Sequence, residues 1–163
     1  MTDAAVHTHA NGLLASIARA EAALAAIPAS LPLLALRIAL AVPFFKSGLT
    51  KWDGFLQLSG GARFLFEQEF KLHILGNQYA YPFPLLSASL AGLAEVVLPI
   101  LLVLGLGTRF AAFALLIMTG VIQLTIPEGW ANFHLPWATM ALALMVWGSG
   151  RIALDPFIMR RGG

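Results

Sequence analysis

Glu95 is the residue of this sequence best placed to do chemistry, because it is the single charge in a long apolar run. The run extends from Phe83 to Thr108 and reads FPLLSASLAGLAEVVLPILLVLGLGT. About 20 apolar helical residues cross the ~30 Å hydrocarbon core of a bilayer. A carboxylate at that depth costs roughly 2.5–3.5 kcal/mol, so it should face protein or a polar cavity. Two interpretations are open for Glu95. It has a functional role, or it is structural and forms an ion pair, or a contact as a protonated carboxyl group, between helices.

Arg37 is the expected partner of Glu95. It lies about six residues into the first apolar helix, which places it roughly 9 Å deep at 1.5 Å per residue. Glu95 enters from the opposite side and lies roughly 12 Å from the same membrane face. A long arginine side chain spans this difference. Depth therefore predicts an Arg37–Glu95 contact, and we take these two residues as the candidate catalytic pair.

Three further polar residues are expected in a second layer, near the opposite face. Lys46 and Gln123 reach a similar depth, roughly 10 Å below that surface, and the loop residue His134 follows nearby. Their side chains can donate hydrogen bonds to the oxygens of a bound cofactor. Two simpler interpretations stay open: Lys46 snorkels to the interface, and His134 caps a helix. Lys46, Gln123 and His134 are the candidate cofactor-binding residues.

The composition is that of an integral membrane protein. Of the 163 residues, 59% are hydrophobic and 11% are charged, against about 45–50% and 25% in soluble domains. The formal net charge of +2 is scattered along the chain, so no nucleic-acid partner is expected. The sequence has no cysteine, which excludes a cysteine-ligated metal. His7 and His9 alternate without a third ligand nearby, so a frayed terminus is favoured over a metal site.

The apolar pattern predicts an all-α fold, an integral membrane four-helix bundle. An N-terminal tail and an amphipathic surface helix are expected before it, and a short interfacial helix between its first two helices. A basic tail should follow it. The expected segments are 1–30 for the tail and surface helix, 31–157 for the bundle, with spans at about 31–50, 83–106, 109–126 and 135–154, 62–70 for the interfacial helix, and 158–163 for the basic tail.

The distribution of Lys and Arg predicts a multi-pass topology with both termini in the cytoplasm. The positive-inside rule counts these residues in the loops between spans. With this topology the inside segments hold five of them and the outside segments three. The first 28 residues lack the basic start of a cleavable signal, so the first span is expected to act as its own insertion signal.

Four short motifs, in order along the chain, resemble the DoxX family of bacterial membrane proteins. They are an early Arg in the first helix, FFKSGLTK at its end, AEVVLPILLVLGLGTR in the second helix, and GSGRIALDPF after the fourth. The resemblance covers about residues 33–157. The positions that match the family pattern are Arg37, Phe45, Gly48, Lys51, Glu95, Gly105, Thr108, Arg109, Gly150, Arg151 and Asp155.

The resemblance implies a protein of the bacterial inner membrane. Members of the family are described as components of membrane oxidoreductases, linked in some cases to thiosulfate and quinone and in others to oxidative-stress complexes. The segment FLFEQEFKLHILGNQYAYPFP is also similar to a subgroup found beside genes for small secreted metal-handling peptides. Phe70 stands here where that subgroup has Tyr.

Two kinds of function follow as expectations. The first is a quinone-linked subunit, in which Lys46, Gln123 and His134 donate hydrogen bonds and Glu95 relays protons. Without cysteine or a nucleotide-binding fingerprint, it would need a redox partner protein. Haem held by His73 and His134 is not expected. The alternative is a non-enzymatic anchor or assembly subunit of a larger complex or of a metal-peptide pathway. Transport is a weaker third expectation. Besides the lipid bilayer, a second copy is a possible partner, because Gly- and Ala-rich faces permit oligomers.

Overall fold

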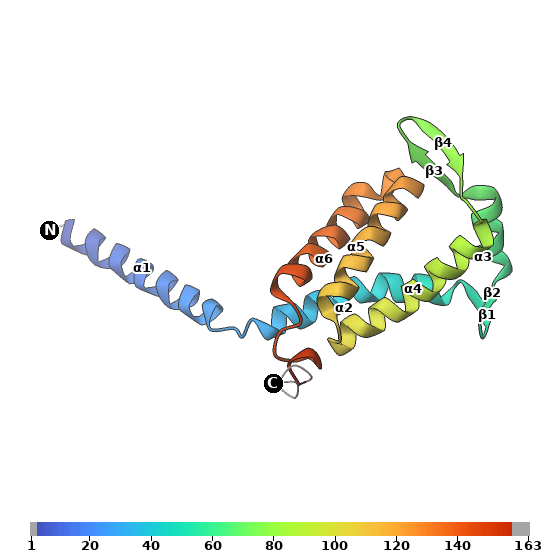
Figure 1. Cartoon of the computed structure of the whole chain (residues 1–163). Coiled ribbons are helices and arrows are strands. Elements are labelled where there is room, and N and C mark those ends of the chain that lie inside the picture. Colours follow the sequence, from blue (N-terminus) through green and yellow to red (C-terminus); the bar gives the residue numbers. More distant parts are fainter. Residues whose placement is uncertain (1–2, 158–163) are drawn as a thin grey trace.

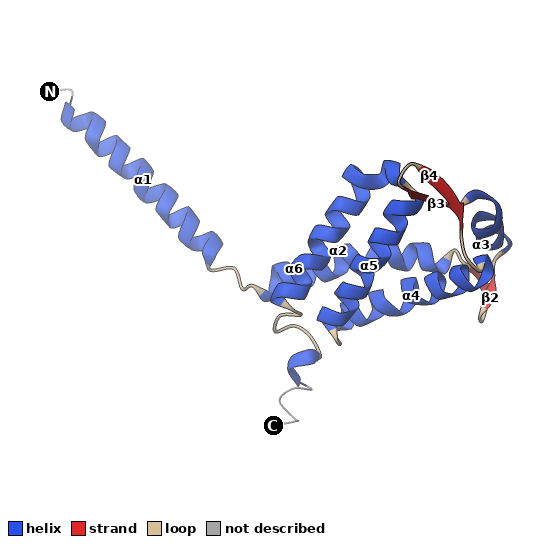
Figure 2. Ribbon diagram, turned by 45° about the horizontal axis from the view of Figure 1, so that its top comes forward, coloured by secondary structure: helices blue, strands red, loops and turns tan. Residues whose placement is uncertain are grey.

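The computed structural model of the chain describes residues 3–157. The predicted basic tail, 158–163, lies outside the described residues. The described part is mostly helical, with two small sheets in the connection between its second and fourth helices (Figures 1 and 2). The helices are α1 (Asp3–Ala25), α2 (Ser30–Leu49), α3 (Gly60–Phe64), α4 (Pro84–Leu104), α5 (Thr108–Thr125) and α6 (Leu135–Trp147).

Three helices, α2, α4 and α5, are long and apolar enough to cross a membrane. Their ends lie within two residues of the predicted spans. Local sequence explains the boundaries of α4: Pro84 occupies its first position, where the missing N–H costs nothing. Gly105, at φ 69°, ends it in the left-handed conformation that favours glycine.

The fourth predicted span, 135–154, is wrong at its C-terminal end. Helix α6 ends at Trp147, because Gly148 and Gly150 adopt positive φ values of 76° and 74°. The chain then folds back beneath the turn between α4 and α5. There the N–H of Asp155 donates to the carbonyl oxygen of Gly105 at 2.9 Å. The expected helical extension is therefore a clasp, residues 148–157, that joins the end of α6 to α4.

The helices α2 and α4 pack against each other, as do α5 and α6 (Figure 1). Glycines let α2 and α4 approach closely, as expected from their small residues. A Cβ at Gly48 would lie 2.9 Å from the backbone carbonyl carbon of Glu95. A Cβ at Gly92 would lie 2.8 Å from the ring of Trp52. The buried apolar core joins α2, α4, α5 and α6 and includes Leu40, Phe44, Leu102, Leu115 and Leu144.

The connection between α2 and α4 corrects the all-α prediction, because it contains two β-hairpins (Figure 2). Strands β1 (Trp52–Gly54) and β2 (Gln57–Leu58) form the first, and β3 (Lys71–Ile74) and β4 (Asn77–Ala80) form the second. The predicted helix at 62–70 is found as α3, followed by the π-helical segment η1 (Leu65–Glu69). Its position at a membrane interface stays a prediction.

Helix α1 projects away from the packed helices (Figures 1 and 2). It begins at Asp3, so that it also takes up most of the predicted N-terminal tail within residues 1–30. Its side chains from Leu14 to Ala25 are exposed. Leu14, Ile17 and Leu24 are large apolar side chains among them, with exposed fractions of 64%, 48% and 67%. The contact of this helix with a membrane surface stays a prediction.

Candidate functional site

A cavity of about 1130 Å³ lies between α2, α4, α5 and the start of α6. In Figure 1, the α2–α4 pair and the α5–α6 pair diverge toward the end that carries the hairpins. Side chains on the facing sides of these pairs form a mostly apolar wall. The polar residues of the wall are Ser47, Lys51, Tyr81, Ser87, Glu95, Thr125, Glu128 and His134.

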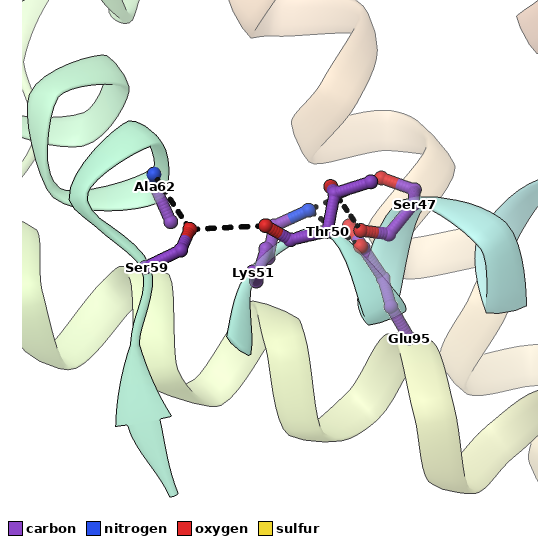
Figure 3. A network of polar contacts seen from close by, with 6 residues as sticks. All are labelled: Ser47, Thr50, Lys51, Ser59, Ala62 and Glu95. Carbon is purple, nitrogen blue, oxygen red and sulfur yellow. Dashed lines mark hydrogen bonds and ion pairs between the residues drawn. The ribbon is translucent and has the colours of Figure 1, made fainter. Parts of the chain in front are cut away.

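Lys51 and Glu95 form an ion pair on this wall. The Nζ atom of Lys51 lies 2.5 Å from Oε2 of Glu95, and the two side chains are only 13% and 6% exposed. The same Nζ atom donates to Oγ of Ser47 at 3.1 Å. Figure 3 shows this network at the end of α2. Because Gly48 lies against the backbone of Glu95, the end of α2 comes close enough for Lys51 to reach the carboxylate.

The loop after α2 holds the backbone of Lys51 in place. Ser59 donates from its Oγ to the carbonyl oxygen of Thr50 at 2.9 Å, and its N–H donates to the carbonyl oxygen of Lys51 at 2.9 Å. The same hydroxyl accepts from the N–H of Ala62 at 3.1 Å and so caps α3 (Figure 3). The ammonium group is thus positioned by a helix end and by a hydrogen-bonded loop.

The predicted Arg37–Glu95 contact is wrong. Arg37 is fully buried and donates to carbonyl oxygens in the last turn of α4, at 3.3 Å for Leu102. It also donates to the carbonyl oxygen of Ile152 in the clasp. Carbonyls at a helix C-terminus lack intrahelical donors and favour a cation. Depth alone assumes that the helices lie parallel. In the structure, Arg37 contacts the C-terminal end of α4 and not its middle, where Glu95 lies.

Arg37 belongs to a second polar cluster, apart from the cavity wall. The carboxylate of Asp155 accepts from the N–H groups of Gly107 at 2.7 Å and Thr108 at 3.1 Å, and so caps the start of α5. Arg37 donates to α4 beside this cap. These contacts tie the clasp to the α4–α5 turn, which assigns a structural role to Arg37. The catalytic role of Glu95 stays a prediction.

Two of the three residues predicted to share a second polar layer, Gln123 and His134, are in direct contact. Nδ1 of His134 lies 2.6 Å from Oε1 of Gln123. His134 is buried, and its ring packs on Trp137 with ring centres 5.5 Å apart. Lys46 does not join them: its side chain is exposed and is not part of the cavity wall. Snorkelling of Lys46 to the membrane interface stays a prediction, as does the cofactor-binding role of Gln123 and His134.

Two π-helical segments contribute to the cavity. Segment η1 supplies Phe66, and segment η3 (Trp130–His134) supplies Phe133 and His134. Such wide turns are rare and are frequently found at functional sites. They also turn aromatic side chains inward: Phe66 packs edge-on to Tyr81 at 5.2 Å between ring centres.

The second hairpin and the residue that follows it, Tyr81, form hydrogen bonds with the C-terminal end of α5. The hydroxyls of Tyr81 and Thr125 are 2.5 Å apart, and burial raises the pKa of Tyr81. The Nδ1 atom of His73 bonds the carbonyl oxygen of Leu124 at 3.1 Å. These bonds join the segment from β3 to α4 with the end of α5, so the hairpin spans the side on which the helix pairs diverge.

Comparison with known proteins identifies the family of this chain. The DoxX family profile matches residues 32–128, more than half of the chain. The chain belongs to the DoxX family. An uncharacterized protein of Haemophilus influenzae is 31% identical over an alignment of 146 residues, and the match covers 82% of this chain and 87% of that protein. No solved structure matches the chain. With three helices long and apolar enough to cross a bilayer, this DoxX protein is a membrane protein.

Seven of the eleven DoxX motif residues identified in the sequence form two groups in the structure. Gly48, Lys51 and Glu95 meet at the ion pair on the cavity wall. Arg37, Gly105, Thr108 and Asp155 meet at the clasp. The motif thus combines one cluster that faces the cavity with one that fastens the helices. The profile match ends before His134, so the histidine side of the cavity lies beyond the matched residues.

Lys51 is the site residue that the sequence analysis did not select. Its position beside Trp52, at the end of the first predicted span, is typical of a residue at the membrane interface. The available signal was its place in the DoxX motif, three residues after Gly48. Metal ligands do not gather in the described part of the chain: no group of three or more His, Cys, Asp or Glu side chains is close enough to hold an ion.

Proposed function

We propose that this DoxX protein binds a quinone in the cavity and is the quinone-linked subunit of a membrane oxidoreductase system. One observation carries the proposal. The cavity is large and apolar, yet its wall includes the partly buried Lys51–Glu95 pair and the buried His134. Sites for small cofactors combine an apolar lining with a few polar groups that fix orientation. A quinone needs the same combination, for its ring and tail and for its two oxygens.

The wall offers a place for each part of such a ligand. Trp137 and Phe44, with ring centres 5.0 Å apart, supply aromatic surface for the ring. Apolar side chains of α4 and α5 line the cavity, and two of them, Leu90 and Ile117, are more than half exposed. An isoprenoid tail would leave between these helices, toward the lipid. Glu95 would accept or release the protons that accompany electrons.

The membrane arrangement belongs to the same proposal. Segment η3, which has 5 residues, continues directly into helix α6, which has 13. At about 1.5 Å per residue, this length approaches the thickness of a hydrocarbon core. We infer a fourth span there, in the inner membrane, with both termini in the cytoplasm and the hairpins on the opposite side. A redox partner protein would carry the second redox centre, because the chain has no cysteine.

The test is a binding titration with a blocked cavity. Protein in mild detergent is titrated with a short-tailed benzoquinone while the fluorescence of the tryptophans, including Trp137 on the wall, is recorded. Ala114→Phe fills the cavity from α5. Ala39→Phe is the matched control, on an exposed position of α2 away from the wall. Saturable quenching that Ala114→Phe abolishes and Ala39→Phe preserves supports the proposal. Quenching that both variants preserve refutes it.

A non-enzymatic anchor or assembly role is the second candidate, and helix α1 is the observation that favours it. Leu14, Ile17 and Leu24 are exposed on a helix that projects from the bundle. Such a helix would join the chain to a larger complex. Deletion of residues 3–25 with retained quinone binding, but with loss of the larger complex on native gels, would assign assembly to α1 and leave the cavity with the first function.

A further inference from the structure

His134 presents a hydrogen-bond acceptor to the cavity, and the backbone carbonyl of Pro127 determines this. A carbonyl oxygen only accepts. Because the Pro127 oxygen lies 3.2 Å from one end of the Gln123 amide, that end is the nitrogen, Nε2. The other end, Oε1, therefore faces His134. The backbone carbonyl of Pro127 therefore sets the orientation of the Gln123 amide.

The orientation of Gln123 then fixes the proton on the imidazole. Oε1 only accepts, so Nδ1 of His134, 2.6 Å away, carries the hydrogen. His134 is only 3% exposed, and burial favours the neutral form of an imidazole. In a neutral ring with a protonated Nδ1, the second nitrogen, Nε2, holds a lone pair. Among the described residues, no donor bonds this nitrogen.

Nε2 is accessible in the structure. It has no hydrogen-bond partner among the described residues, and it is not among the fully enclosed atoms that lack one. The backbone of Gly129 lies against this edge of the ring, where a Cβ would come within 2.7 Å of Nε2 and 2.6 Å of the adjacent ring carbon. A side chain at position 129 would therefore clash with the ring. Because His134 is part of the cavity wall, we take the lone pair of Nε2 as an acceptor for a ligand in the cavity.

Glu95 supplies a second acceptor on the same wall. Its Oε2 atom is paired with Lys51. Within the part of the chain that the structure describes, its Oε1 atom has no hydrogen-bond partner, and it is not among the enclosed atoms that lack one. A carboxylate paired with an ammonium group is an acceptor only. The wall thus carries two open acceptors, one from α4 and one from η3.

We propose that the cavity binds the reduced, dihydroxy form of its ligand, a quinol, more tightly than the quinone, with His134 Nε2 and Glu95 Oε1 as its acceptors. This inference rests on the proposed function and adds which redox form the site selects. A quinol has two hydroxyl donors, one for each open acceptor. A quinone has only carbonyl oxygens, which leave both acceptors unmatched, and only the remaining N–H of Lys51 and nearby hydroxyls can serve it.

The preference has a consequence for electron transfer. We expect the quinol to bind at least about tenfold more tightly, the factor that one net hydrogen bond confers. By linkage, a tenfold preference for the reduced form raises the midpoint potential of the bound two-electron couple by about 30 mV. The site would thereby favour the uptake of two electrons and two protons by a bound quinone, and it would hold the product.

The test compares the two redox forms of one ligand. Under anaerobic conditions, the protein in detergent is titrated with a short-tailed benzoquinone and, separately, with the same compound after reduction by dithionite. His134→Phe keeps an aromatic ring and removes the acceptor. Gln123→Leu keeps the histidine but removes the group that fixes its proton. His73→Phe is the matched control, because His73 lies outside the cavity wall.

Tighter binding of the quinol by wild type and by His73→Phe, with the ratio reduced toward one in His134→Phe and Gln123→Leu, supports the inference. Equal binding of the two forms, or tighter binding of the quinone, by the wild-type protein overturns it and leaves the proposed function standing. Binding of neither form overturns both. The comparison in wild type decides the matter even where a variant fails to fold.

Discussion

Lys51 and Glu95, separated by 44 positions in the sequence, meet at 2.5 Å between the end of α2 and the middle of α4. The contact exists because Gly48 has no side chain: α2 lies against the backbone of Glu95 at that point. It therefore couples the packing of two membrane helices to the polarity of the cavity wall. A second contact of the helix pair, between Arg37 and the last turn of α4, joins the opposite end.

The first prediction concerns the coupling of this pair. Glu95→Gln and Lys51→Met should each destabilise the protein by about 3–5 kcal/mol, because either leaves a poorly solvated charge unpaired. The double variant should lose less than the sum, with a coupling energy of about 0.5–3 kcal/mol. Thermal unfolding in detergent measures all four proteins. Arg37→Met with Glu95→Gln is the comparison pair and should be additive; additivity in the Lys51 cycle instead would refute the ion pair.

The second prediction concerns Gly48. Gly48→Ala places a Cβ 2.9 Å from the backbone of Glu95, which must then move. We expect a loss of about 1–3 kcal/mol, as for other overpacked cores, and a weaker Lys51–Glu95 contact. The matched control is Gly120→Ala in α5, where a Cβ would meet nothing within 4 Å. If the melting temperatures of the two variants agreed, the close approach of α2 and α4 would be in error.

The third prediction concerns the clasp. Asp155→Ala removes the carboxylate that accepts from the N–H groups of Gly107 and Thr108 at the start of α5. Loss of such a cap costs about 0.5–2 kcal/mol. Asp155→Asn should recover part of this, because the amide oxygen still accepts. The melting temperature should fall in the order wild type, Asn, Ala, while quinone binding by the folded protein stays unchanged.

The helices of this fold follow from local rules, which is why they could be predicted. Apolar runs gave the three long helices, and Pro84 and Gly105 marked the ends of α4. The hairpins did not follow, because strands of two to four residues have too little alternation to stand out from a loop. The end of α6 was missed because the sequence does not show that Gly148 and Gly150 turn the chain back onto α4.

Part of the candidate site could be predicted from the sequence, and the contact between distant helices could not. Residues that are close in sequence, such as Gln123 and His134, were brought together correctly by their shared depth. Contacts between distant helices depend on crossing angle and on which face is presented, which depth alone does not contain. Glu95 was correctly expected to face protein, yet its partner is Lys51 rather than Arg37. A glycine three residues before a lysine was the local sign of that pairing.

An oxidised-minus-reduced ultraviolet spectrum of the purified protein shows whether the cavity holds a quinone. The protein is prepared in mild detergent after incubation with excess quinone and removal of the unbound part. We expect a quinone difference spectrum near one equivalent per chain, lost in Ala114→Phe and kept in Ala39→Phe. A wild-type spectrum without a quinone signal, or a signal equal in both variants, would contradict it.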